Sequence, residues 1–101
     1  MNLSLKNFQR FEKQIILKKI GVSGQKKILN SKVLIIGIGG LGCPLLIYLT
    51  AAGVGTIGIV DHDKVELSNL SRQILFTHKD IGKFKVYQAK AHVTKINKKT
   101  K

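Results

Sequence analysis

The sequence predicts an α/β fold in which two parallel strands are joined by a crossover helix. Three observations predict it. A continuous apolar, β-branched run at residues 33–36 leads directly into a glycine-rich turn at residues 37–42. A strongly apolar stretch follows at residues 45–52, and a second β-branched run occupies Thr56–Val60. Strand, glycine turn, helix and strand in this order make a βαβ unit, whose strands are parallel.

Two helices are expected before the first strand. Apolar residues recur at spacings of three and four after Asn7, a suitable N-cap, and Gly21 can end this amphipathic helix. Ser23 can cap a second, short helix. The run at 33–36 is apolar throughout, which is typical of a strand buried on both faces.

The crossover helix has clear end signals. Pro44 suits the first turn of a helix, where its missing N–H would be unpaired in any case. Gly53 can end the helix, and the second strand then ends at Asp61.

The second half of the chain is expected to hold a loop and one more helix. Residues 62–79 show no sustained period, so we expect a loop with one helical turn near residues 68–73. After Gly82, one helix face is marked by Val86, Ala89, Val93 and Ile96.

Such a helix normally returns the chain to a neighbouring strand, and a sheet of two strands leaves apolar faces and edges uncovered. We therefore expect residues 1–101 to be the N-terminal part of an incomplete domain, truncated after one βαβ unit and a following helix.

The charge balance bears on partners. Lys and Arg number 18 against 5 acidic residues, for a net charge of +13, so a polyanionic partner has to be considered. Only two of the basic residues are arginine, and the lysines are spread along the chain without an aromatic platform. We expect a solvated, lysine-rich surface and no specific nucleic-acid partner.

The single cysteine, Cys43, lies in an apolar helical run and is expected to be a buried core residue. Without a CxxC pair the chain has no structural zinc site, and no apolar run approaches the ~20 residues of a membrane span. We expect a cytoplasmic protein with no membrane partner.

The remaining polar candidates have no metal-ligand spacing, so we expect exposed histidines and a loop-stabilising role for two carboxylates. These residues are His62, His78, His92, Asp63 and Glu66.

Residues 37–42 form a GxGxxG motif between a buried strand and a helix N-terminus, where backbone N–H groups and the helix dipole attract phosphate. Asp61 lies 19 residues after Gly42, at the end of the next strand, where a carboxylate can accept hydrogen bonds from ribose. Tight helix–strand packing is the structural alternative for the glycines. Motif, context and acid together predict nucleotide binding on a Rossmann-like, doubly wound sheet.

Three further segments resemble ThiF-type adenylyltransferases. Residues 10–14, R-F-E-K-Q, resemble the R-[YF]-x-R-Q opening of that family. Residues 68–73, S-N-L-S-R-Q, resemble its S-N-L-x-R-Q loop, and residues 81–86, I-G-K-F-K-V, resemble its I-G-x-x-K-[VA] helix start. The resemblance runs from about Phe8 to the C-terminus. It points to the branch of the molybdopterin-synthase and thiazole-pathway adenylyltransferases, relatives of ubiquitin-activating enzymes.

The resemblance implies a reaction in molybdopterin or thiamine biosynthesis. The C-terminal carboxylate of a ubiquitin-like sulfur-carrier protein attacks the α-phosphate of ATP, giving an acyl-adenylate and pyrophosphate. By carry-over, Arg72 and Lys85 contact the phosphates and Asn69 orients the nucleotide, and Arg10 and Lys13 reach the partner's ATP across a homodimer. The expected cofactor-binding residues are Gly37, Gly39, Gly40, Gly42, Asp61, Ser68, Asn69, Leu70, Ser71, Arg72 and Lys85.

The chain departs from the family in two respects. Lys13 stands where the family has arginine, which loses bidentate phosphate contact but keeps the charge. The family's magnesium-binding aspartate, its zinc-binding CxxC pairs and its acceptor cysteine have no counterpart in these 101 residues. We therefore do not expect this chain alone to be active, and we expect either a homodimer or a complementing second half.

Two other classes stay open. An NAD-binding oxidoreductase also needs GxGxxG followed by an acid, although it has no particular need for Arg72 and Lys85 beside the phosphates. A non-catalytic nucleotide-binding or dimerising remnant would keep the same motifs. The tRNA threonylcarbamoyladenosine dehydratase branch is a closer relative whose loop usually departs from S-N-L-x-R-Q.

Overall fold

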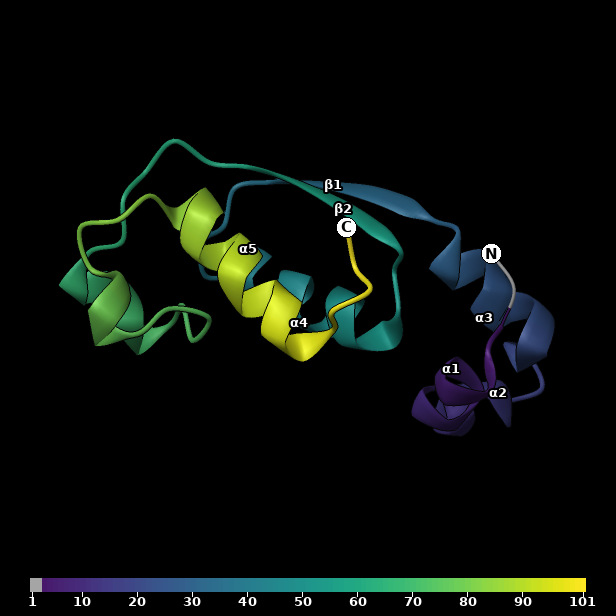
Figure 1. The fold of residues 1–101 in the computed structure, drawn as a ribbon. Coiled ribbons are helices and arrows are strands. Elements are labelled where there is room, and N and C mark those ends of the chain that lie inside the picture. The colour runs from purple at the N-terminus through teal and green to yellow at the C-terminus, as the bar shows by residue number, and fades with distance from the viewer. Residues whose placement is uncertain (1–2) are drawn as a thin grey trace.

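The computed structural model describes residues 3–101 and has two layers (Figure 1). One layer is a sheet of two parallel strands, β1 (Lys32–Ile36) and β2 (Thr56–Val60), paired in register from Lys32↔Thr56 to Ile36↔Val60. The other consists of α4 (Gly42–Ala52) and α5 (Lys85–Ile96), which lie on the same side of the sheet. The predicted βαβ unit with parallel strands is confirmed.

The two faces of β1 differ in burial. Ile35 is buried in the core, whereas Leu34 and Ile36 are 62% and 78% exposed. The prediction that this strand is buried on both faces is therefore wrong for the described part of the chain. The reason is that α4 and α5 cover one face only, and side chains that alternate along a strand point to opposite faces.

α4 follows the predicted signals closely. It starts at Gly42, has Pro44 in its first turn and ends at Gly53, which adopts the left-handed conformation with φ 101°. That conformation favours glycine, and a Cβ at Gly53 would also lie 2.8 Å from the ring of Phe11. The end of α4 is thus also the surface on which the N-terminal helices pack.

The N-terminal region has three helices, α1 (Leu5–Arg10), α2 (Glu12–Ile15) and α3 (Gly21–Leu29). The hydroxyl of Ser4, not Asn7, caps the first one by accepting from the backbone N–H of Asn7 at 3.1 Å. The predicted single helix from Asn7 to Gly21 is wrong, because the chain leaves the helix at Phe11, whose side chain is buried.

The boundary at Gly21 also differs from the prediction. Gly21 begins α3 instead of ending the previous helix, and Ser23 lies inside α3 instead of capping it. A positive φ of 58° at Gly21 turns the chain directly into α3.

Two glutamines, the half-buried Gln14 and the buried Gln25, connect these helices to α4. The side-chain amide of Gln14 donates to Gln25 at 2.6 Å, and both amides donate to the carbonyl of Ala52 at 3.1 Å. Gln25 is fully buried, so these bonds satisfy polar groups that would otherwise lose water without compensation.

The segment between β2 and α5 holds two short 3-10 helices, η1 (Leu67–Ser71) and η2 (His78–Asp80). The first corresponds to the predicted helical turn, and the second was not predicted. This segment and the glycine-rich turn lie at one end of a molecule that measures 42 × 21 × 20 Å, and α1–α3 lie at the other end (Figure 1). Between them the core contains Ile35, Ile38, Cys43, Leu46, Val65, Leu75, Phe76, Ala89 and Val93.

The outer edge of β2 makes backbone bonds with the last residue. The N–H of Lys101 donates to the carbonyl of Gly55 at 2.9 Å, and the N–H of Ile57 donates to the carbonyl of Lys101 at 2.8 Å. This alternation is the pattern of a parallel ladder. None of the helices within residues 3–101 has the length and apolar character that crossing a membrane requires.

Candidate functional site

The glycine-rich turn connects β1 to α4 and is held by a backbone bond to β2 and by close packing of its own backbone. Gly37 has φ 89°, and its N–H donates to the carbonyl of Val60 at 2.7 Å. A Cβ at Gly42 would lie 2.0 Å from the carbonyl oxygen of Gly37, so only glycine fits there. In contrast, a Cβ at Gly39 would meet no atom within 4 Å. The turn therefore combines one glycine required by packing with open backbone that a phosphate can approach.

Asp61 follows β2 and fixes the turn from the side. Its carboxylate accepts from the N–H of Ile38 at 2.8 Å and from the N–H of Asp63 at 2.8 Å. Burial by itself raises the pKa of Asp61, but these two hydrogen bonds and the charge of Lys85 outweigh it and hold the pKa below its usual value. Asp61 is thus an ionised acceptor at the predicted position, and it orders the glycine-rich turn as well.

Arg72 lies against the turn. A Cβ at Gly40 would meet the Cδ of Arg72 at 3.7 Å, so the stem of this side chain passes over Gly40. Its guanidinium donates to the carbonyl of Ser68 at 3.1 Å and is otherwise exposed. A cation therefore stands beside the open backbone of the turn.

Lys85 is buried, with 5% of its surface exposed, at the first position of α5. It is therefore not one of the many solvated lysines. Its backbone N–H donates to the carbonyl of Asp63 at 3.0 Å, two residues after Asp61, and its positive charge favours the ionised form of Asp61. Burial raises the pKa of the Cys43 thiol to about 11, more than Lys85 lowers it, so Cys43 is a neutral core residue as predicted.

Asn69 is largely buried and holds η1 together. Its side-chain oxygen accepts from the N–H of Glu66 at 2.8 Å, and the carboxylate of Glu66 accepts from the N–H of Asn69. This reciprocal pair is a capping box. The loop-stabilising role predicted for Glu66 is confirmed, and Asn69 has a structural role in addition to any contact with a ligand.

The side chains next to Asn69 make fewer contacts that hold η1 together. Ser68 and Ser71 are exposed, with the hydroxyl of Ser71 donating to the carbonyl of Ser68 at 3.3 Å, and Leu70 is half-buried against the core.

Arg10 and Lys13 lie far from the turn in the same chain. The guanidinium of Arg10 donates to the carbonyl of Ile96 at the end of α5, and Lys13 is exposed on α2. Both helices lie at the end of the molecule opposite η1 (Figure 1). One chain therefore brings together Asp61, Arg72 and Lys85 but not these two cations.

A hollow of 520 Å³ opens beside the glycine-rich turn and is lined by apolar side chains and open backbone. The lining residues of the hollow are Leu34, Ile35, Ile36, Gly37, Gly39, Gly40, Leu41, Gly42 and Leu45.

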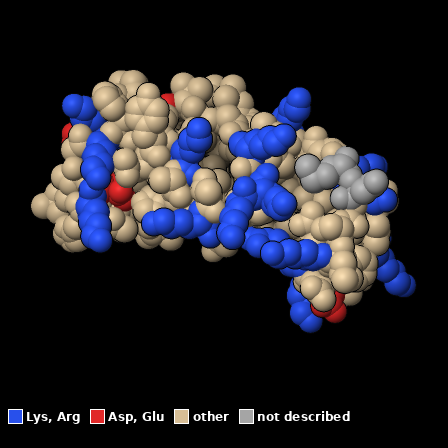
Figure 2. Space-filling view, viewed as in Figure 1, with Lys and Arg blue, Asp and Glu red and all other residues tan. Residues whose placement is uncertain are grey.

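Among residues 3–101 no group of three or more His, Cys, Asp or Glu side chains is arranged to hold a metal ion. Figure 2 shows Lys and Arg side chains spread widely over one face of the molecule, with few acidic side chains between them.

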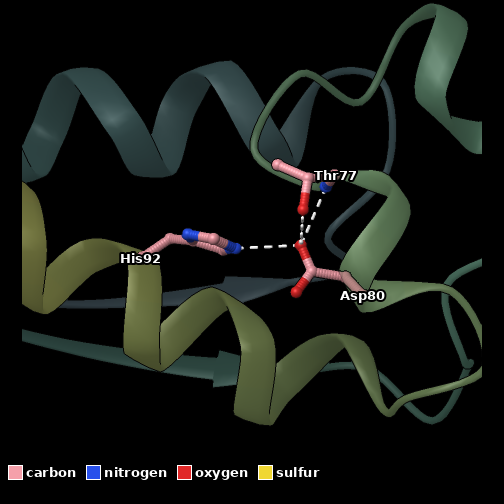
Figure 3. A network of polar contacts seen from close by, with 3 residues as sticks. All are labelled: Thr77, Asp80 and His92. Carbon is pink, nitrogen blue, oxygen red and sulfur yellow. Dashed lines mark hydrogen bonds and ion pairs between the residues drawn. The ribbon is translucent and has the colours of Figure 1, made fainter.

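A polar cluster that sequence reasoning missed joins η2 to α5 (Figure 3). One oxygen of Asp80 accepts from the N–H of Thr77 at 2.8 Å and from its hydroxyl at 3.2 Å, and it lies 2.9 Å from Nε2 of His92. The prediction of an exposed histidine is wrong for His92, whose side chain is 21% exposed. The T-x-x-D spacing of a capping box could have revealed the first pair, but nothing local in the sequence links Asp80 to His92.

Comparison with known proteins is consistent across sequence and structure. Residues 11–101 match the model of the ThiF family. The chain is 52% identical over 96 residues to the adenylyltransferase and sulfurtransferase UBA4 of Saccharomyces cerevisiae, covering 94% of the chain and 22% of the relative. It is 50% identical over 94 residues to a probable molybdopterin-synthase adenylyltransferase of Porphyra purpurea, covering 93% and 25%. The chain thus spans about a quarter of the length of these curated relatives.

Solved structures show the same fold. The tRNA N6-threonylcarbamoyladenosine dehydratase TcdA of E. coli superposes with a TM-score of 0.91 at 26% identity, covering 100% of this chain and 41% of the other. A structure of E. coli MccB with ATP gives a TM-score of 0.83 at 34% identity, covering 90% and 29%. These likenesses confirm the predicted α/β, Rossmann-like fold class.

Proposed function

This chain belongs to the ThiF family, and from that premise we propose that it supplies the nucleotide-binding part of an ATP-dependent adenylyltransferase. The substrate we infer is the C-terminal carboxylate of a ubiquitin-like sulfur-carrier protein. The relatives named as sulfurtransferases and as molybdopterin-synthase adenylyltransferases support this substrate, since they are about 50% identical to the chain. The structural neighbours at 26–34% identity support ATP and the fold but carry other names.

The observation that carries the proposal is the pair of cations at the glycine-rich turn. The stem of Arg72 lies over Gly40, and the buried Lys85 stands near Asp61. A nicotinamide cofactor needs the glycines and the acid but places no comparable demand on two cations beside its phosphates. A triphosphate with an attacking carboxylate does, because two anions have to meet.

The reaction that this site supports is a substitution at the α-phosphorus of ATP. A carboxylate oxygen of the carrier forms a bond to the α-phosphorus. The bond between the α-phosphorus and the oxygen that bridges the α- and β-phosphates breaks, so that pyrophosphate leaves with that oxygen. Negative charge develops on the phosphate oxygens during this step. Arg72 and Lys85 are held in position before the reaction, which stabilises this charge without the cost of reorganising solvent.

We assign binding roles to the other residues around the turn. Gly37 and Gly39 are open, and only the stem of Arg72 approaches Gly40, so these glycines let phosphate oxygens approach backbone N–H groups at the start of α4. The ionised Asp61 accepts from ribose hydroxyls with the lone pairs that its backbone bonds leave free. The η1 segment, from Ser68 to Ser71, packs beside the nucleotide.

For Arg10 and Lys13 we propose a role in a second copy of the chain. They lie on α1 and α2, at the end of the molecule opposite the segment between β2 and α5, so we assign them to the site of a partner copy (Figure 1). This assignment predicts that Arg10 exchanges its bond to Ile96 for a phosphate contact on dimerisation. Because residues 3–101 offer no cluster of metal ligands, we derive no step through a metal ion.

Calorimetry with ATP and NAD tests the proposal. We expect the chain to bind ATP more tightly than NAD. Arg72→Ala and Lys85→Ala each remove a charge-assisted contact worth about 1.5–3 kcal/mol, so ATP affinity should fall at least roughly tenfold. Lys26→Ala, which removes an exposed lysine from α3, is the matched control and should leave affinity unchanged. Tighter binding of NAD, or unchanged affinity in both site variants, would contradict the proposal.

A further inference from the structure

The cluster of Thr77, Asp80 and His92, here called the clamp, lies outside the nucleotide site but is connected to it (Figure 3). Asp80 is buried, with 5% of its side chain exposed, and three contacts, from the N–H and the hydroxyl of Thr77 and from His92, converge on one of its oxygens. An ionised carboxylate can only accept, so Nε2 of His92 must carry the hydrogen and donate it. The clamp therefore joins η2 to α5 by a directional bond.

His92 lies seven residues after Lys85 on α5, and residues at this spacing share one face of a helix. Both residues interact with the segment between β2 and α5. The backbone N–H of Lys85 donates to the carbonyl of Asp63 at the start of this segment, and His92 binds Asp80 near its end. The same helix thus holds both ends of the segment.

A backbone strap connects the clamp to Asp61. The strap consists of residues 63–65 and 82–85, joined by three hydrogen bonds: Gly82 N–H to Val65, Val65 N–H to Lys83, and Lys85 N–H to Asp63, at 2.8–3.0 Å. At one end the strap continues into η2 through a bond from the N–H of Lys83 to the carbonyl of Asp80 at 3.0 Å.

At its other end the strap reaches the glycine-rich turn. The N–H of Asp63 donates to Asp61, which in turn accepts from Ile38. Contacts therefore run without a gap from His92 through the strap to the turn.

We propose that His92 and Asp80 are positioning residues of the nucleotide site. By holding η2 on α5, the clamp fixes the strap, and the strap sets Lys85 and Asp61 relative to the glycine-rich turn. The inference rests on the proposed function for the identity of the ligand, ATP. The clamp itself touches no part of that site, so its effect on binding has to pass through the strap.

The test compares two substitutions at one position in the full chain. His92→Gln keeps an amide donor close to where Nε2 stands, whereas His92→Leu keeps a similar volume and removes the donor. We expect His92→Leu to weaken ATP binding by about three- to tenfold and His92→Gln to stay close to wild type. His78→Leu makes the same change at an exposed histidine of η2 and should have no effect.

Amide hydrogen exchange supplies a readout that does not need ATP. His92→Leu should speed exchange at residues 82–85 and at Ile38 but leave α3, at the far end of the molecule, unchanged. Equal acceleration in α3 would mean general destabilisation and would overturn a positioning role, as would unchanged exchange in the strap.

The two readouts separate failure of the clamp from failure of the proposed function. If wild type binds ATP and His92→Leu loosens the strap without weakening binding, the positioning role is wrong. If wild type does not bind ATP, the proposed function fails, and the exchange pattern alone then supports or overturns the clamp.

Discussion

At the residue scale, the glycines of the turn divide into those that the fold requires and those that leave room for a ligand. Gly42 would place a Cβ 2.0 Å from a backbone oxygen, whereas Gly39 would place one in open space. Glycine is therefore present at Gly42 because of close backbone packing and at Gly39 to leave room for a ligand. Substitutions can separate these two reasons.

Gly42→Ala should destabilise the fold by roughly 1–3 kcal/mol, because the backbone of the turn has to move to admit the methyl group. Urea unfolding followed by circular dichroism measures this. Gly39→Ala is the matched control: stability should stay within about 0.5 kcal/mol of wild type, and ATP affinity should fall because the added methyl group faces the proposed phosphate position. Equal stability of the two variants would show that the turn does not close as described.

Cys43 is fully buried and its pKa is raised to about 11, so at neutral pH very little thiolate exists and reagents cannot reach it. We expect alkylation by iodoacetamide at pH 8 to be slow in the folded chain and fast in denaturant. Mass spectrometry measures both rates. Rapid alkylation of the folded chain would mean that the start of α4 opens readily.

At the element scale, most boundaries follow local signals, and the exceptions have tertiary causes. α4 ends at Gly53 because both its own backbone conformation and its neighbours require a glycine there. α1 ends early because Phe11 turns into the core.

Gly53→Ala combines a left-handed conformation with contacts of 2.8–2.9 Å to Phe11 and Gln25. Gly82→Ala has a similar φ of 84° but meets no atom within 4 Å. We therefore expect Gly82→Ala to cost about 1 kcal/mol through backbone strain and Gly53→Ala to cost clearly more. Thermal unfolding of both variants checks the order, and a smaller loss for Gly53→Ala would contradict the packing of α1–α3 on α4.

The pKa values of Asp61 and Asp80 are both lowered in the folded chain; burial opposes this change, but hydrogen bonds outweigh it. A carboxylate with a lowered folded pKa contributes stability above its unfolded pKa of about 3.9, and that contribution is lost as pH falls through the folded pKa. We expect unfolding free energy to decline with acid below about pH 4, and less steeply in Asp80→Asn. Urea titrations from about pH 2 to pH 6 measure the slope, with Glu12→Gln as the control for loss of one exposed charge.

At the scale of the whole molecule, one face of the sheet lacks a covering layer in residues 3–101. Leu34, Ile36 and Leu41 are 62%, 78% and 88% exposed along this face and the adjoining turn. A contiguous apolar surface of this kind favours association.

The double variant Leu34→Thr and Ile36→Thr places β-branched residues at both positions of β1 but makes its open face polar. We expect it to reduce concentration-dependent association, measured by light scattering, without lowering the melting temperature much. Replacing the buried Ile35 by Thr is the contrasting control and should destabilise the chain. Unchanged association in the double variant would mean that the chains associate through a surface other than the open face of β1.

The sequence alone was sufficient for the βαβ order, the parallel strands and the ends of α4, because periodicity, Pro44 and Gly53 act locally. It also identified the glycine-rich turn and Asp61 as site candidates from motif spacing, and the resemblance to ThiF-type enzymes added Arg72 and Lys85. Their roles toward ATP stay predictions.

Only the tertiary structure decided which of these residues meet. In the structure Lys85 is buried and its charge acts on Asp61, and the stem of Arg72 lies over Gly40. Arg10 lies at the opposite end of the molecule and is bonded to Ile96. The tertiary structure also paired His92 with Asp80 and exposed one face of β1. Such contacts join segments far apart in sequence, and they depend on which elements pack together, a property that no local pattern of residues encodes.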